Sequence, residues 1–189
     1  MKKIVIRFNA PVILTFALLS LLALLLGNWT NGATTYQYFS VYRASLSDPL
    51  TYVRFFGHVL GHADYEHYMS NMLLILLVGP GLEEKYGSGT MVWTIALTAL
   101  ITGLLHFVFF PNTVLLGASG VVFMMIVLSS FTAMRRGEIP VTLILVVIFY
   151  LGGEIMDGLF KQDSISQITH IVGGLCGLVF GFTIRRGRR

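Results

Sequence analysis

The sequence predicts an all-α polytopic membrane protein, and its composition supports this fold class. Of its 189 residues, 55% are hydrophobic and only 12% are charged, which is about half the charged share of a soluble domain. The mean hydropathy is +0.77. A large apolar core alone does not explain these values, because a surface in water would still need charges. A chain of this length predicts a single membrane domain over residues 1–189.

The remaining composition excludes several other classes of protein. The 20 glycines form no repeat, leucine is abundant, and there is one cysteine, so collagen-like, disordered and disulfide-rich chains do not fit. The formal net charge of +4 suggests nucleic-acid binding at first sight. The cations, however, are clustered beside apolar runs, which is a topology signal, and we expect no nucleic-acid partner.

Six apolar stretches account for most of the chain. They are about Ala10–Leu26, His67–Leu82, Thr90–Phe110, Ser119–Met134, Ile139–Gly153 and Ile165–Ile184. Crossing a 30 Å hydrocarbon core takes roughly 20 residues. The second, fourth and fifth stretches are short by this measure, which predicts helices that stop partway, inside protein or beside a water-filled cavity.

The cations predict an orientation for these six spans. With the N-terminus inside, the inner segments hold ten Lys and Arg residues and the outer segments hold three, namely Arg43, Arg54 and Lys161. This bias places both termini in the cytoplasm and predicts a multi-pass protein of the plasma or inner membrane. Lys2 and Lys3 followed by Val12–Leu26 also fit a cleaved signal peptide, and the charge count does not decide between the two.

Polar residues inside the spans are candidates for function, and four of them share one depth. At 1.5 Å per residue, Ser119 lies about 24 Å from the inner edge and His170 about 22 Å. His67 lies about 24 Å and Asn71 about 18 Å from that edge. Three different helices therefore bring Ser, His and Asn side chains to the outer half of the bilayer.

Ser119 lies in the sequence Gly117-Ala118-Ser119-Gly120, where an apolar helix is expected to begin after a break at Pro111-Asn112. A serine at a helix start lies beside free backbone N–H groups and the positive end of the helix dipole. Such groups stabilise an oxyanion. A simple helix N-cap serine is the alternative interpretation.

His170 precedes a glycine seam on the sixth span. Gly173, Gly177 and Gly181 recur every four residues and form one face that permits close helix approach. If the partner helix is the span that begins at Ser119, His170 can accept the serine proton. No carboxylate lies in either span, so the chemistry would use a Ser–His dyad. A histidine bonded only to a backbone carbonyl is the alternative.

A third cluster of polar residues begins the second span. His67 and Asn71 are four residues apart, share a helix face, and can both donate to an oxyanion. The spacing of His58, His62 and Glu66 would also allow a zinc site on a helix. There is no HExxH motif and no pair of intramembrane aspartates, so we expect no metal and no cofactor.

Together these residues resemble the rhomboid family of intramembrane serine proteases, over about Arg54–Gly181. The shared pattern is His62, His67 and Asn71 on the second span, GASG at 117–120, and His170 with Gly173 and Gly177 on the sixth. The turn Glu83–Gly87 followed by Ser88-Gly89 also matches. The resemblance implies a six-helix bundle that cleaves transmembrane helices of membrane proteins near the outer face.

The resemblance also implies a role for each matching residue. Ser119 would be the nucleophile, His170 the general base, and His67, Asn71 and the Ser119 N–H the oxyanion hole. Gly117 would let the preceding loop pack. The implied partners are membrane proteins with a transmembrane helix, and the oligomeric state is open. Hydrogen-bonding support would come from His62 and Glu83.

Two positions differ from the family pattern, and neither removes a catalytic group. A common Trp-Arg pair is Val53-Arg54 here, which affects loop packing. A common tyrosine is Phe123 here, which keeps the ring that stacks on the catalytic histidine. Two other functions stay open: a non-catalytic relative that binds membrane helices, and a small transporter. The fifth span and the loop Glu154–Ser164 are candidate substrate gates.

Overall fold

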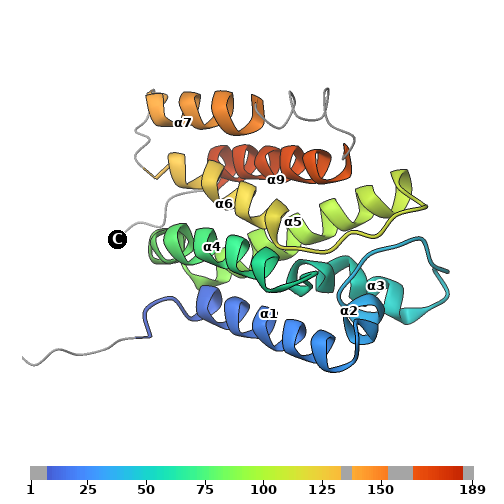
Figure 1. The fold of residues 1–189 in the computed structure, drawn as a ribbon. Helices are drawn as coiled ribbons and strands as arrows, with labels where there is room; N and C mark the ends of the chain where they lie inside the picture. Colours follow the sequence, from blue (N-terminus) through green and yellow to red (C-terminus); the bar gives the residue numbers. More distant parts are fainter. Residues whose placement is uncertain (1–7, 133–137, 153–163, 185–189) are drawn as a thin grey trace, which may run out of the picture.

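The computed structural model describes residues 8–132, 138–152 and 164–184, and within these ranges the chain is helical (Figure 1). The elements are α1 (Pro11–Trp29), α2 (Ala33–Tyr38), α3 (Pro49–Gly57), the 3₁₀ turn η1 (His58–Leu60), α4 (Tyr65–Tyr86), α5 (Ser88–Phe109), α6 (Ser119–Ser130), α7 (Val141–Val146), the π-helical turn η2 (Val147–Leu151) and α9 (Ser164–Thr183). The described ranges contain no strand, only an isolated antiparallel bridge between Val41 and Leu115. The predicted all-α fold is confirmed.

Helix α6 lies at the centre of the bundle, between α4 and α9 (Figure 1). Its residues from Gly120 to Leu128 are buried on nearly every side, with only Phe123 partly exposed. A helix that is apolar all round is expected to be enclosed by other helices. Ser119, at its first position, is therefore held by the most enclosed element of the described chain.

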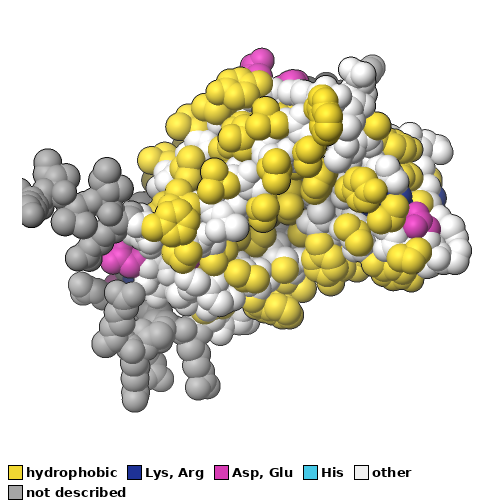
Figure 2. Space-filling view, turned by 90° about the horizontal axis from the view of Figure 1, so that it is seen from below, with side chains coloured by type: hydrophobic (Ala, Val, Ile, Leu, Met, Phe, Trp, Pro, Cys, Tyr) yellow, Lys and Arg dark blue, Asp and Glu magenta, His cyan; other side chains and the backbone are white. Residues whose placement is uncertain are grey.

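The outer surface of the bundle is also apolar. Leu73 and Leu77 on α4 are 66% and 76% exposed, and Leu18, Leu22 and Leu25 on α1 are exposed as well. Figure 2 shows the α1 side of the molecule covered by hydrophobic side chains, with charged groups only at its margins. Helices α1 and α5 are long and apolar enough to cross a membrane. Hydrocarbon, not water, is the solvent that such a surface fits.

The structure corrects the expected length of the second span. The sequence analysis ended it at Leu82 as a short helix, whereas α4 spans 22 residues from Tyr65 to Tyr86. The helix continues because Glu83 is buried and hydrogen-bonded, so its charge does not end the buried segment.

Helix α6 has 12 residues, in keeping with a short fourth span, and the expected end at Met134 lies outside the described residues. The candidate gate segment before Ser164 also lies outside them.

The carboxylate of Glu83 joins α4 to the start of α1. It accepts hydrogen bonds from the backbone N–H groups of Val12 and Ile13, each at 3.0 Å, and from the hydroxyl of Ser88 at 2.7 Å. The first N–H groups of a helix lack partners within it and favour a negative charge. Glu83 thus fixes the N-terminal end of α1 to the junction of α4 and α5.

The loop between α1 and α4 is ordered around Arg54, which is buried. Its guanidinium pairs with Asp48 at 3.2 Å, donates to the Gln37 carbonyl at 2.9 Å, and lies 4.6 Å from the centre of the Tyr42 ring. Val53, by contrast, points outward and is exposed. The departure from the Trp-Arg pattern at Val53 therefore leaves the buried contacts of Arg54 in place.

Candidate active site

Ser119 is the first residue of α6. Helix α5 ends at Phe109, and the chain then runs through Pro111-Asn112 and the bridge at Leu115, so the predicted break is confirmed. The N-cap position belongs to Ala118, not to Ser119. The backbone N–H groups of the first turn, including that of Ser119, have no carbonyl partner within the helix. They can donate to an anion that forms beside the Ser119 hydroxyl.

Gly117 shapes the loop that leads into Ser119. Its φ of +124° lies in a region that side chains disfavour. A Cβ atom there would lie only 2.8 Å from Nε2 of His67. The Gly117 N–H donates to the His58 carbonyl at 2.9 Å. Gly117, two residues before Ser119, thereby holds the loop between η1 and the His67 ring.

Helix α9 packs closely along α6 through the glycine seam. A Cβ on Gly173 would collide with the backbone carbonyl of Gly120, and one on Gly177 would lie 2.5 Å from the Met124 carbonyl oxygen. Gly181 faces the Phe131 ring in the same way. The seam was expected to bring the last span against a partner helix, and this partner is the helix of Ser119.

This packing carries His170 to the same face as Ser119. The His170 ring stacks on Phe123 with 4.4 Å between centroids and 8° between planes, so the expected stacking is present. Phe123 lies one turn along α6 from Ser119 and on the same face. Thr169 lies over Gly120, with its Cγ2 3.3 Å from the position of a Cβ there. Ser119 and His170 both remain partly exposed.

His67 lies on the other side of Ser119, in the first turn of α4. The Asp64 side chain caps this helix by accepting the His67 N–H at 2.8 Å. The Ala63 N–H donates to Nδ1 of His67 at 3.5 Å, which leaves Nε2 to carry the ring proton. Because Nε2 is next to Gly117, this proton is directed toward the serine loop.

Asn71 is buried one turn below His67. One of its amide protons is donated to the His67 carbonyl at 2.8 Å. An asparagine amide has two donors, so the second remains for another acceptor. The contact also holds the first turn of α4 in place beneath the His67 ring.

His62 and His58 support this arrangement from the segment before α4. His62 was expected on the second span, but α4 begins only at Tyr65, after the Asp64 cap. His62 contacts the His67 ring edge-on at 5.0 Å, and its Nδ1 is 3.1 Å from the Leu60 carbonyl. Burial, with the charge of His67, lowers the pKa of His62 to about 4. Burial likewise lowers the pKa of His58 to about 4. Both rings are therefore neutral near pH 7.

A polar cavity of about 450 Å³ lies beside His62. Asn28, Asn31, Thr35 and Ser40 are among its polar lining residues. Val114 and Leu116, from the loop before Ser119, also line it. Such a lining can hold water. Solvent can thus stand next to the segment that leads into Ser119.

The histidines that could have formed a zinc site are used otherwise. The His58 ring contacts the Arg54 carbonyl through Nδ1 and the Thr102 hydroxyl through Nε2, and Glu66 is exposed on α4. Across the described ranges, no three His, Cys, Asp or Glu side chains come close enough to hold a metal ion.

The sequence analysis missed three supports of the site. His58 was weighed only as a metal ligand, although its carbonyl holds Gly117; Asp64 was not singled out as the cap of α4. Asp is a preferred N-cap residue, so Asp64 shortly before the expected second span was a usable signal for the cap. No signal in the sequence indicates the bridge between Val41 and Leu115, because it joins residues far apart in the chain.

Comparison with known proteins agrees with this helical site. The sequence profile of the Rhomboid domain matches residues 49–187. The chain is 33% identical over 144 residues to Rhomboid-related protein 1 of Caenorhabditis elegans, covering 69% of this chain and 39% of that protein. It is 27% identical over 173 residues to Rhomboid-related protein 2 of Mus musculus, covering 78% of this chain and 56% of that one.

The fold and the matched domain define an integral membrane protein, and the chain belongs to the rhomboid family. It spans about half or less of the length of the two relatives named above.

Proposed function

We propose that the chain is an intramembrane serine protease in which Ser119 is the nucleophile and His170 the general base. The observation that supports this most directly is the stacking of His170 on Phe123, one turn from Ser119. The close contact of Gly173 with Gly120 fixes that geometry. Nucleophilic catalysis needs the serine and the histidine within hydrogen-bond reach of each other, and their position on tightly packed facing helices supports this assignment.

The oxyanion hole would form on the α4 side of the serine. The first-turn N–H groups of α6, the Nε2 proton of His67 and the second amide proton of Asn71 are its donors. The Ser119 oxygen attacks the peptide carbonyl carbon while His170 takes the hydroxyl proton. The negative charge that forms on the carbonyl oxygen is then stabilised by these donors.

The reaction would finish in three proton transfers. Protonated His170 gives its proton to the departing amine, which leaves an acyl-enzyme on Ser119. Water then attacks the ester while His170 takes its proton, and the protonated His170 returns this proton to the Ser119 oxygen as the ester bond breaks and the carboxylic acid product is released. No metal or cofactor takes part in this scheme.

The substrates we propose are membrane proteins with a transmembrane helix. The outward-facing apolar surface of the bundle lets such a helix approach through the bilayer. A helical amide is shielded, so the segment that reaches Ser119 must unwind. We also propose six membrane crossings, both termini in the cytoplasm, and the site in the outer half of a plasma or inner membrane bilayer.

Cleavage in reconstituted vesicles tests this function. The full chain is incorporated with tagged single-span proteins whose transmembrane helices carry Gly and Ser near the outer face, and products are identified by mass spectrometry. We expect internal cleavage by the wild type and none by Ser119→Ala or His170→Ala, while Ser129→Ala cleaves normally. Cleavage by folded Ser119→Ala at the wild-type rate would refute the nucleophile. Helix binding without cleavage would favour the non-catalytic function.

A further inference from the structure

Every polar atom of His67 except one has a hydrogen-bond partner among the described residues. Its N–H donates to the Asp64 carboxylate at 2.8 Å, and its carbonyl accepts from the Asn71 side-chain amide at 2.8 Å. Its ring nitrogen Nδ1 accepts from the Ala63 N–H at 3.5 Å. Nε2 is the exception in this part of the chain, and it lies 2.8 Å from the position that a Cβ on Gly117 would take.

The contacts at the start of α4 form a reciprocal cap. Asp64 is the N-cap residue, with an extended backbone, and His67 is the third residue of the helix. In the common capping box, the side chain at this third position accepts from the backbone N–H of the N-cap residue itself. Here the His67 ring accepts one residue earlier, from the Ala63 N–H. The cap of α4 and the protonation of this ring are therefore linked.

The Ala63 N–H determines which ring nitrogen of His67 carries the proton. A neutral imidazole that accepts at Nδ1 carries its proton on Nε2. Without that N–H, either nitrogen could carry it. In the other tautomer Nε2 has a lone pair, which would repel an oxyanion instead of donating to it. The placement of one backbone N–H thus decides whether His67 can act as an oxyanion donor.

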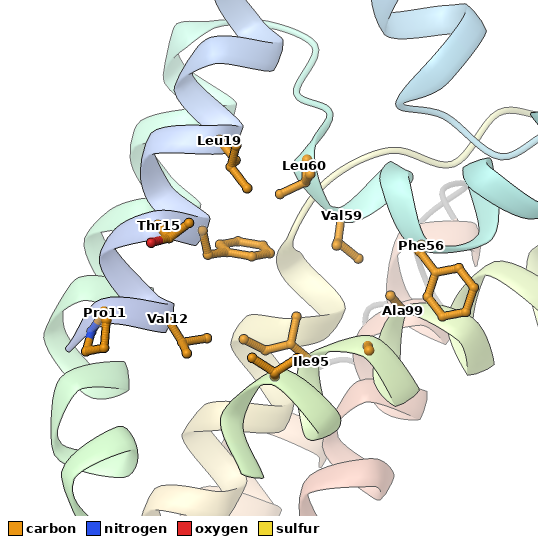
Figure 3. A pocket seen from close by; sticks show the side chains of 12 residues that line it. Pro11, Val12, Thr15, Leu19, Phe56, Val59, Leu60, Ile95 and Ala99 are labelled. Carbon is orange, nitrogen blue, oxygen red and sulfur yellow. The ribbon is translucent and has the colours of Figure 1, made fainter. Parts of the chain in front are cut away.

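The chain before the cap is held by other contacts. Val59 and Leu60 of η1 lie over an apolar pocket between α1 and α5 (Figure 3). Gly61 packs so closely on the preceding loop that a Cβ there would collide with the Phe39 carbonyl. These contacts fix the segment as far as Gly61, and the Asp64 cap then fixes where α4 begins.

We propose that Asp64 is a positioning residue: as the N-cap of α4 it keeps the Ala63 N–H on Nδ1 of His67, and so keeps the ring proton on Nε2. The proposal rests on the proposed protease function, in which this proton is donated to the oxyanion. Asp64 itself touches neither the substrate nor the reacting atoms. Its acceptor oxygen is required and its negative charge is not. The donor is set before a substrate arrives, which is what makes an oxyanion hole effective.

Three substitutions separate the cap from the charge. Asp64→Ala removes the acceptor, and Asp64→Asn keeps an acceptor oxygen without the charge, since asparagine caps helices about as well as aspartate. Glu66→Ala removes a charge from an exposed position in the same turn. Because an oxyanion donor acts in the transition state, we expect kcat in vesicle cleavage to fall at least about five-fold in Asp64→Ala, with KM changed less than about two-fold. The other two variants should stay within about two-fold of the wild-type kcat.

Nitrogen NMR of the ring reads the tautomer without any proteolysis. The full chain with isotope-labelled histidine is studied in detergent at about pH 8, where an ordinary imidazole is neutral, and His67→Gln identifies the His67 signals. We expect the proton on Nε2 in the wild type, Asp64→Asn and Glu66→Ala, and a mixture of tautomers in Asp64→Ala. Thermal unfolding checks that each variant folds. If Asp64→Ala does not, Asp64→Gly takes its place, because glycine is a better N-cap than alanine.

Several results would overturn the proposal. An unchanged tautomer in folded Asp64→Ala would show that the Ala63 N–H stays in place without the cap. A changed tautomer with unchanged kcat would separate the cap from catalysis. A loss of kcat in Asp64→Asn or Glu66→Ala as large as in Asp64→Ala would assign the effect to charge. If the wild type cleaves no substrate, the protease function fails, and the NMR measurement still supports or refutes the link between the cap and the ring.

Discussion

The contact between Phe123 and His170 shows what a single ring contributes to the site. The imidazole has one face covered by a parallel aromatic ring at 4.4 Å, which limits its rotation. No phenolic hydroxyl is needed for this, so the phenylalanine at this position keeps the orienting contact. The ring therefore acts by positioning His170 and not by reacting.

Substituting Phe123 should change turnover more than folding. A stacked aromatic pair contributes about 0.5–1.5 kcal/mol beyond area burial, so Phe123→Leu should lower kcat about two- to ten-fold. Phe123→Tyr keeps the ring and should remain near the wild-type rate. The comparison uses vesicle cleavage kinetics, with thermal unfolding as the folding control. An equal loss of kcat in both variants would show that the effect does not come from ring stacking.

The buried histidines of the loop predict a dependence of stability on pH. The pKa of His58 is lowered to about 4 by burial, below its ordinary value of 6.5, so the unfolded chain binds this proton first as pH falls. Stability is complete above about pH 6.5 and should decline between pH 6.5 and 4, by at most about 3 kcal/mol for this group.

Thermal unfolding in detergent measured across that range checks the linkage. His58→Gln keeps a polar group that can donate to the Arg54 carbonyl, and it should flatten the decline while lowering the stability at pH 7. An unchanged pH profile in a folded His58→Gln protein would show that other groups carry the dependence. His62, with its pKa also lowered to about 4, supplies the remaining slope in the variant.

Among the elements, the pair α6 and α9 determines the site. The three seam glycines lack the side chains that would separate the helices, and the Gly120 backbone, the Met124 carbonyl and the Phe131 ring lie against them. Small residues at such contacts are the common basis of close helix packing in membranes. His170 is carried on the same helix, so the seam determines its distance from Ser119.

Gly173→Ala should separate these helices. The added Cβ meets the Gly120 backbone, which cannot rotate away as a side chain can, and we expect at least a ten-fold loss of turnover with reduced thermal stability. Gly81→Ala is the matched control, since a Cβ there meets nothing within 4 Å. It should retain activity and gain up to about 1 kcal/mol of stability. Normal activity of Gly173→Ala would show that the packing tolerates expansion.

The elements differ in how far the sequence predicted them. The break at Pro111-Asn112, the start of α6 and the seam on α9 follow from local residue types and spacing, so they were predictable. The C-terminal end of α4 was not, because Glu83 is bonded by the start of α1, 70 residues away in the sequence. The helices α2 and α3 were also missed. The aromatic residues around them are typical of the membrane–water interface, and they do not specify a backbone conformation.

For the site, the sequence placed Ser119, His170, His67 and Asn71 at one depth, and the structure brings their helices together. The supports that surround them depend on long-range pairing. The hydrogen bond from Gly117 to the His58 carbonyl and the bridge from Leu115 to Val41 join distant segments. Such contacts leave no periodic pattern in a single sequence.

In the whole molecule, apolar side chains occupy both the interior and the outer surface. Packing between helices and a few buried polar contacts, rather than the exclusion of water, must then hold the bundle together. The Glu83 carboxylate is the clearest such contact, because it joins α1 to the α4–α5 junction through three hydrogen bonds. It lies at the opposite end of α4 from His67.

Glu83→Gln should therefore lower the stability of the whole bundle while leaving the site chemistry intact. A neutral amide cannot accept all three hydrogen bonds as well, and hydrogen bonds to charged groups contribute about 1.5–3 kcal/mol each. Thermal unfolding should show a clear loss for Glu83→Gln and little for Glu84→Gln, which is exposed on the same turn. A larger effect at Glu84 would contradict the anchoring role.

The proposed activation of Ser119 can be tested without knowing any substrate. The full chain in lipid vesicles is treated with a fluorophosphonate probe, and the labelled residue is identified by mass spectrometry. We predict covalent labelling at Ser119 that is lost in Ser119→Ala, falls sharply in His170→Ala and is unchanged in Ser129→Ala. An unlabelled Ser119 in folded, lipid-embedded protein, or labelling that persists at the wild-type rate in His170→Ala, would contradict the proposed dyad.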